Sequence, residues 1–167
     1  MAFADFWRLM AAIGDFEVWL AIVFLILALY AVFPKSKKHR IAFLVFVLVP
    51  SLFISAGITE LLKIYTQIPR PCLGQADCPS NFSFPSGHAA AMFALAAAVA
   101  LNNKNLGIKS AFAILAILVS ISRVALNYHT YADIIGGAFV GISTVYLIEI
   151  LYKRNILSLK AFKSIIS

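Results

Sequence analysis

The sequence predicts an all-α integral membrane protein, a helical bundle of about five transmembrane helices preceded by a short N-terminal interfacial helix. Hydrophobic residues make up 62% of the 167 residues, and the mean hydropathy is +0.93. Such a chain is too apolar for a soluble domain with a polar surface. Long apolar runs alternate with short polar segments, and the basic residues gather in alternate segments, as they do in membrane proteins. We therefore expect one membrane-embedded domain over 1–167.

The first helix is predicted over residues 1–13, which place aromatic and apolar side chains on one side, away from Asp5 and Arg8. That pattern is typical of a helix lying in the membrane interface, and a frayed extension of the next helix is the alternative. The first span is predicted over 16–33, because this run is long enough to cross a bilayer. No basic segment of a cleaved signal peptide precedes the span, and Pro34 ends it.

The segment 34–40 carries four Lys/Arg and is placed in the cytoplasm, because short basic loops stay on that side. The second span, about 41–62, then runs outward, and Pro50 predicts a kink in it. The loop 64–84 is therefore expected outside the cytoplasm. Its prolines predict a rigid, irregular cap.

Three further spans complete the expected bundle. The third is rich in alanine, and small side chains let neighbouring helices approach closely, which predicts a central position. The remaining elements are the third span over 86–101, a cytoplasmic turn over 102–109, the fourth span over 108–126, an outer turn over 127–131, the fifth span over 131–152, and a basic cytoplasmic tail.

The distribution of charge supports this topology. Of the 14 Lys/Arg, four fall in the first inner loop, two in the second and four in the tail, so ten lie on the cytoplasmic side. Besides Arg8, the basic residues left on the outer side are Lys63, Arg70 and Arg123. The charge of +7 is thus accounted for by membrane orientation, and we expect no nucleic-acid partner.

The two cysteines, Cys72 and Cys78, lie close together in the predicted outer loop. In an oxidising compartment a disulfide closing a short ring is the simplest interpretation. A zinc-binding pair is the alternative, although this spacing is unusual for zinc ligands.

Three cations are expected at the outer face although they are far apart in sequence. Lys63, Arg70 and Arg123 would repel one another beside apolar helices unless an anion joins them. A phosphate group would satisfy all three. Ser86 and Gly87 open the third span, where unpaired backbone N–H groups and the helix dipole also favour an anion.

Two histidines and one carboxylate are expected at the same level. His129 and Asp133 are four residues apart at the start of the fifth span, so they share one face. The carboxylate can hold one ring nitrogen protonated and leave the other free to attack. His88, on another helix, could give a proton to a leaving oxygen. These are the parts of a metal-free phosphoryl transfer site.

Taken one at a time, each of these residues also has a structural explanation, such as a snorkelling helix end or a capped core histidine. Their collection on one side of the membrane is the specific signal, because ionisable groups near the bilayer are costly. The set consists of Lys63 and Arg70-Pro71, then Pro85-Ser86-Gly87-His88, then Ser122-Arg123 with His129 and Asp133.

These motifs, over 63–133, resemble the three signatures of the type-2 phosphatidic acid phosphatase superfamily at every signature position. The resemblance implies a membrane phosphatase without a cofactor, in which His129 becomes a phosphohistidine, His88 protonates the leaving group and Asp133 orients His129. The phosphoryl oxygens would be bound by Lys63, Arg70, Ser86, Gly87 and Arg123. Soluble vanadium haloperoxidases have similar signatures, but five apolar spans argue against that branch.

The expected substrate is a lipid phosphate or diphosphate at the outer face of the plasma (inner) membrane, with the C-terminus in the cytoplasm. Undecaprenyl diphosphate is the first candidate, followed by phosphatidylglycerophosphate, phosphatidic acid and lipid A 1-phosphate. Many family members resemble a six-span pattern, so five spans are a departure that affects how lipid reaches the site. Oligomeric state is left open by the sequence.

Two other function classes are considered. An anion or lipid transporter could use the outer cations for selection, although the spans show no inverted repeat. A metal site could combine His88, His129 and Asp133 with Cys72 or Cys78, although three neighbouring cations would repel a divalent ion.

Overall fold

The computed structural model describes residues 2–13, 18, 21, 23–25, 28, 42–76 and 78–166. Its regular elements are all helical: α1 (Ala2–Ile13), the π-helical turn η1 (Leu44–Leu48), α4 (Val49–Thr66), α5 (Gly87–Asn102), α6 (Leu106–Ala125) and α7 (Tyr131–Ile166). The predicted all-α class is confirmed. The predicted first span over 16–33 and the basic loop over 34–40 fall mostly outside the described residues.

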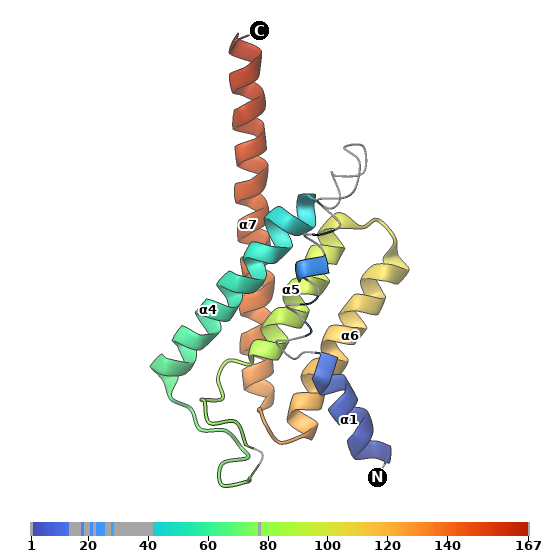
Figure 1. Cartoon of the computed structure of the whole chain (residues 1–167), viewed down its shortest axis with the longest axis vertical. Helices are drawn as coiled ribbons and strands as arrows, with labels where there is room; N and C mark the ends of the chain where they lie inside the picture. Colours follow the sequence, from blue (N-terminus) through green and yellow to red (C-terminus); the bar gives the residue numbers. More distant parts are fainter. Residues whose placement is uncertain are drawn as a thin grey trace.

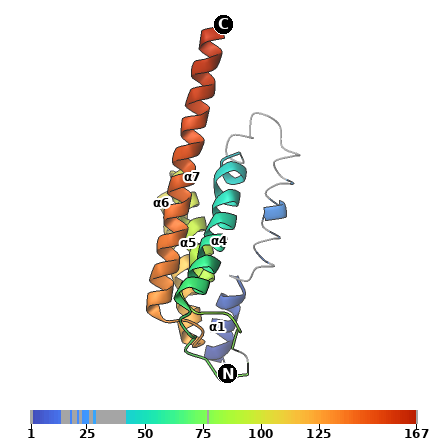
Figure 2. The ribbon, with the colours of Figure 1, turned by 90° about the vertical axis from the view of Figure 1, so that its left-hand side faces the viewer.

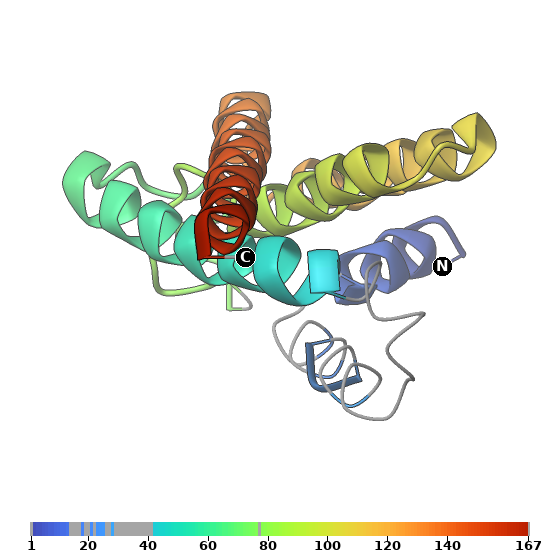
Figure 3. The ribbon, with the colours of Figure 1, turned by 90° about the horizontal axis from the view of Figure 1, so that it is seen from above.

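Three of these helices, over 44–66, 106–125 and 131–154, are long and apolar enough to cross a membrane, and α5 is a shorter apolar helix. α4 and α6 lie on opposite sides of α5 and α7 (Figures 1 and 3). The long irregular segment 67–86 gathers at the end where α4 and α6 finish and where α5 and α7 begin (Figure 1). We call this the site end of the bundle.

Pro50 marks the change from η1 to α4. It occupies the first turn of α4, where its missing N–H costs least, and the five residues of the π-helical turn lie just before it. π-turns inside helices accompany local bends. The helix continues to Thr66, beyond the predicted end at residue 62, and Gln67 in the left-handed region closes it.

α5 is the central helix, as its alanines predicted. It packs against α4, α6 and α7, and its residues Ala94 and Ala98 are fully buried against Val145 of α7. Two glycines of α7 allow the close approach. A Cβ on Gly137 or on Gly141 would fall within 3.0 Å of backbone or side-chain atoms of the α5 segment, so any larger residue would force the helices apart.

α7 is much longer than the predicted fifth span over 131–152. It runs unbroken to Ile166 and extends beyond the other helices at the end opposite the site (Figure 2). The predicted tail is therefore a continuation of the helix. Strong helix-forming residues are frequent after 152, and no proline or glycine interrupts them, which allows the backbone ladder to continue into the polar segment.

α1 packs against α6 and lies at the site end beside the irregular segment (Figures 1 and 2). Ala11 is buried and Leu9 is exposed, which fits a helix with one covered face. Its placement in the membrane interface stays a prediction.

Candidate active site

The structure brings the polar clusters together at the site end. Lys63 lies in the last turn of α4, Arg70 follows in the loop, and Ser86 caps α5. The α6–α7 turn carries His129, directly before α7. A cavity of about 350 Å³ opens among them, and six of the eight predicted site residues line it: Lys63, Arg70, Gly87, His88, Arg123 and His129.

The other two predicted residues, Ser86 and Asp133, lie behind the cavity wall. Ser86 is fully buried; its side chain caps α5 by accepting from the N–H of Ala89, and its own N–H donates to the carbonyl of Asp133 at 2.9 Å. This backbone bond joins the start of α5 to the start of α7, so the two helices hold their site residues in register.

His129 is 3% exposed, and its contacts define its tautomer. The Nη1 atom of Arg70 lies 3.0 Å from Nε2 of His129. A guanidinium can only donate hydrogen bonds, so Nε2 must accept and carry no proton. The proton of the neutral ring therefore sits on Nδ1. The lone pair of Nε2 therefore faces Arg70, the cation that is expected to bind phosphate, at the wall of the cavity that both residues line.

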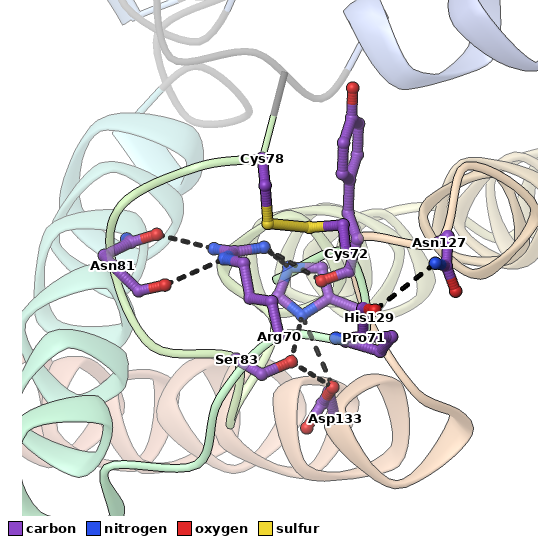
Figure 4. Close-up of a disulfide and its surroundings, with 10 residues drawn as sticks. Arg70, Pro71, Cys72, Cys78, Asn81, Ser83, Asn127, His129 and Asp133 are labelled. Carbon is purple, nitrogen blue, oxygen red and sulfur yellow. Dashed lines mark hydrogen bonds and ion pairs between the residues drawn. A yellow bond between two sulfur atoms is a disulfide. The ribbon is translucent and has the colours of Figure 1, made fainter. Parts of the chain in front are cut away.

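The Asp133 carboxylate sits on the opposite edge of the imidazole (Figure 4). Its Oδ2 atom accepts the hydroxyl of Ser83 at 2.6 Å and the backbone N–H of Thr130 at 2.6 Å. The same oxygen is 3.5 Å from Nδ1 of His129. The predicted pairing of His129 with Asp133 is thus present in the structure at a longer distance than an ordinary N–H···O bond.

The environment keeps His129 neutral. Burial first, and then the charge of Arg70, lower the pKa of His129 from 6.5 to about 3, although Asp133 acts in the opposite direction. Desolvation penalises the imidazolium form, and a nearby cation does the same. A neutral imidazole is the form that can act as a nucleophile.

Arg70 is held by a network that the sequence did not predict. Its Nε donates to the carbonyl of Asn81 at 2.9 Å, and its Nη2 donates to the side-chain Oδ1 of Asn81 at 2.7 Å. Nη1 also donates to the carbonyl of Tyr128 at 3.0 Å. Burial lowers the pKa of Arg70. Both ends of the guanidinium are therefore fixed before any ligand binds.

A disulfide joins Cys72 to Cys78, with the two Cα atoms 5.5 Å apart. In the sequence the ring that it closes lies between Arg70 and Asn81, which face each other in Figure 4, so it constrains the loop that carries both partners. Because both sulfur atoms form this bond, neither cysteine is available as a thiolate ligand for the alternative metal site. Among the described residues, no group of three or more His, Cys, Asp or Glu side chains could hold a metal ion.

The two remaining cations have their own contacts. Lys63 forms an ion pair with Glu60, one turn earlier on α4. The guanidinium of Arg123 stacks over the ring of Tyr128, 4.7 Å from its centroid, an arrangement favoured for arginine. A Cβ on Gly87 would point toward Lys63, 4.0 Å from Nζ. Gly87 thus leaves space beside the first turn of α5, where N–H groups are unpaired within the helix.

The cavity also has an apolar limb. Beyond the charged end it is lined by Leu52, Phe53, Ala56 and Ala91, which belong to α4 and α5. This limb runs along α4, a helix that is apolar enough to cross the bilayer. A molecule with a phosphate at one end and an apolar chain at the other matches both parts.

Sequence reasoning missed Asn81, Ser83, Glu60 and Thr59. Asn81 and Ser83 lie in the polar segment just before Pro85, where only their position beside a motif could have singled them out. Glu60 and Thr59 line the cavity from α4. Their helical spacing from Lys63, three and four residues, is the signal that could have identified them.

A known protein family matches most of this chain. The family model described as PAP2 superfamily matches residues 43–157. Among curated proteins no sequence matches.

Two crystal structures share the fold. One is the transmembrane PAP2 type phosphatidylglycerolphosphate phosphatase from Bacillus subtilis, with a TM-score of 0.74 and 20% identity, covering 91% of this chain and 77% of that protein. The other is LpxE from Aquifex aeolicus, with a TM-score of 0.71 and 24% identity, covering 88% and 85%. The family match spans most of the chain and contains all three polar clusters, and the chain therefore belongs to the PAP2 superfamily.

Proposed function

We propose that this protein is a membrane lipid phosphatase that removes a terminal phosphate from a lipid phosphate or diphosphate through a phosphohistidine at His129. The observation that carries the proposal is the position of Nε2 of His129, which lies beside the cavity and 3.0 Å from Nη1 of Arg70. That cavity joins a cationic end to an apolar limb.

In the first step of the proposed mechanism, the phosphoryl group enters among Lys63, Arg70 and Arg123. Arg70 then transfers its Nη1 hydrogen bond from Nε2 to a phosphoryl oxygen, which frees the nucleophile. Nε2 forms a bond to phosphorus as the bond from phosphorus to the lipid oxygen breaks. The fixed cations stabilise the charge that spreads over the equatorial oxygens.

His88, which also lines the cavity, supplies the proton that the departing lipid oxygen takes up. In the second step, water attacks phosphorus and His88 takes back a proton from it. The P–N bond breaks, phosphate leaves, and His129 returns to its neutral form. Each turnover therefore consumes one water, and the protein needs no change in its own redox or metal state.

Among lipids, we propose undecaprenyl diphosphate as the substrate to test first. A diphosphate headgroup carries more negative charge than a monoester, and three cations surround the cavity, which favours the more highly charged ligand. Phosphatidylglycerophosphate, phosphatidic acid and lipid A 1-phosphate are the alternatives, since each carries a terminal phosphate on an apolar body. We place the site at the outer face of the plasma (inner) membrane, from the excess of Lys/Arg in the predicted inner segments.

The test is phosphate release by detergent-purified protein in excess EDTA, over a panel of these four lipids. Wild type should release phosphate, whereas His129→Ala should release none above background. The matched control is His39→Ala, which changes a histidine of the predicted cytoplasmic loop. Asp133→Asn should reduce turnover by about 10⁴-fold, as loss of the orienting carboxylate does in a catalytic triad.

A transient phosphoenzyme provides a second readout. Substrate labelled with ³²P in its terminal phosphate should label the wild-type protein during rapid quenching, and His129→Ala should stay unlabelled. Unchanged turnover in His129→Ala would refute the mechanism. Labelled lipid that crosses vesicle membranes unhydrolysed, with wild type and His129→Ala alike, would favour the transporter alternative.

A further inference from the structure

A hydroxyl group stands between the imidazole and the carboxylate of the site. Nδ1 of His129 and Oδ2 of Asp133 are 3.5 Å apart, which exceeds the usual 2.7–3.2 Å of an N–H···O bond. Oγ of Ser83 is 2.6 Å from that Oδ2 and 3.4 Å from that Nδ1, so the serine oxygen is slightly closer to Nδ1 than the carboxylate is, although this hydrogen bond is also long. Ser83 lies outside the three family motifs. Its hydroxyl can donate one hydrogen bond while it accepts another.

We propose that Ser83 is a positioning residue that connects His129 to Asp133. Its oxygen accepts the Nδ1–H of His129, and its hydrogen is donated to Oδ2 of Asp133. The carboxylate thus orients the nucleophile through the serine hydroxyl. This inference rests on the proposed function, because it assigns His129 as the group that attacks phosphorus.

The donors and acceptors of the site give each hydrogen bond in this series a direction. Arg70 can only donate, so Nε2 accepts and Nδ1 carries the proton. Asp133 accepts from Ser83, and this uses the single hydrogen of the hydroxyl. The serine therefore faces Nδ1 with a lone pair. Each hydrogen bond in the series from Arg70 through His129 and Ser83 to Asp133 then has its own donor hydrogen.

The same arrangement serves the reaction. When Nε2 bonds to phosphorus, the ring gains positive charge while Nδ1 keeps its proton. That N–H then becomes a stronger donor, and the Ser83 oxygen, polarised by its bond to Asp133, is the acceptor facing it. No proton moves through Ser83 at any step. Its contribution is to fix the tautomer and the ring orientation.

The backbone holds Ser83 firmly in this place. The residue is fully buried, and its N–H donates to the carbonyl of Ile68 at 2.8 Å. Removing the hydroxyl would leave Nδ1 without its nearest oxygen at a position where both His129 and Ser83 are buried. Water cannot easily replace a buried hydrogen bond.

The experiment combines nitrogen NMR of the resting protein with kinetics. Protein with ¹⁵N-labelled histidine should show His129 protonated on Nδ1. Ser83→Ala should give a mixture of the two tautomers and a kcat about 10-fold to 100-fold lower, the effect of losing one hydrogen bond to a charged group. KM should stay within about twofold, because the phosphate contacts are intact. Ser83→Thr, which keeps the hydroxyl, should restore the Nδ1 tautomer.

Ser120→Ala is the matched control. Ser120 is as buried as Ser83, and its hydroxyl has no hydrogen-bond partner among the described residues. It should leave both the tautomer and kcat unchanged. A wild-type His129 protonated on Nε2 would overturn the proposal whatever the variants do. So would a folded Ser83→Ala protein with the wild-type tautomer and kcat.

The outcome can be separated from that of the proposed function. If wild type hydrolyses no lipid phosphate, the proposed function fails, but the NMR tautomer still decides whether Ser83 sets the state of the ring. If Ser83→Ala does not fold, the decision falls to wild type and Ser83→Thr. An Nδ1 tautomer in both supports the proposal, and its loss in a folded Ser83→Thr protein refutes it.

Discussion

The contact between α5 and α7 predicts a defect in catalysis from a substitution that touches no polar site residue. Gly137 lies one turn after Asp133 on α7. A Cβ at this position would fall below 3.0 Å from the carbonyl oxygen of Ser86, and 2.9 Å from the Cβ of Ala89. Real Cβ atoms essentially never approach so closely. Gly137→Ala must therefore push the first turn of α5 away from α7.

The size of the effect follows from what this contact positions. Relief of the overlap needs a shift of about 1 Å, and a displacement of that size in a catalytic group costs about 100-fold in rate. The shift would also strain the bond from the N–H of Ser86 to the carbonyl of Asp133, now 2.9 Å. Overpacking should lower the free energy of unfolding by about 1–3 kcal/mol.

The assay is phosphate release together with thermal unfolding in the same detergent. Gly57→Ala is the control, since a Cβ at Gly57 meets nothing within 4 Å. It should be neutral or stabilising by up to about 1 kcal/mol, the ordinary gain of alanine over glycine within a helix. Gly137→Ala with wild-type kcat and stability would refute the claim that the α5–α7 spacing sets the site.

Three further predictions concern the loop and the nucleophile. Because its pKa is lowered to about 3, His129 should stay neutral as the pH falls from 7.5 to 5; an NMR titration midpoint near 6.5 would contradict this. Since an unfolded histidine protonates near 6.5, the contribution of His129 to stability should be full above 6.5 and decline toward pH 3. Asn81→Ala removes a 2.7 Å bond to Arg70 and should raise the inhibition constant of inorganic phosphate at least about 10-fold, with KM and circular dichroism as checks. Reduction of the Cys72–Cys78 disulfide should also weaken phosphate inhibition while helical content stays constant. Free thiols in protein prepared without reductant would contradict the presence of this disulfide.

Arg70 connects these predictions, because it contacts His129 in the structure and is proposed to bind the phosphoryl group during the reaction. In the resting protein its Nη1 donates a hydrogen bond to Nε2 of His129, and in the proposed mechanism it binds the phosphoryl group. Its fixed partners, Asn81 and the carbonyl of Tyr128, keep the guanidinium beside the nucleophile in both states. A preorganised cation of this kind needs little rearrangement when charge develops in the transition state.

Much of the fold was predictable because bilayer physics acts on the sequence locally. Apolar length marks a span wherever it occurs, and the predicted spans over 41–62 and 108–126 differ from the observed helices by only a few residues. The end of α7 was missed for a related reason. Hydropathy reports where the apolar segment stops, whereas the helix itself continues through residues of high helix propensity.

The sequence by itself determined that this is a membrane protein, which residues form the three polar clusters, and which family those clusters resemble. These follow from residue type and spacing, which are properties of the linear chain. Only the tertiary structure decided which groups touch. It placed Arg70 against Nε2 of His129, put Ser83 between the imidazole and Asp133, and brought Asn81 to the guanidinium. Such contacts depend on how the irregular segment 67–86 packs against the starts of α5 and α7. Close packing around Gly137 and Gly141 fixes the spacing of those two helices at the ångström scale, and no local pattern encodes it.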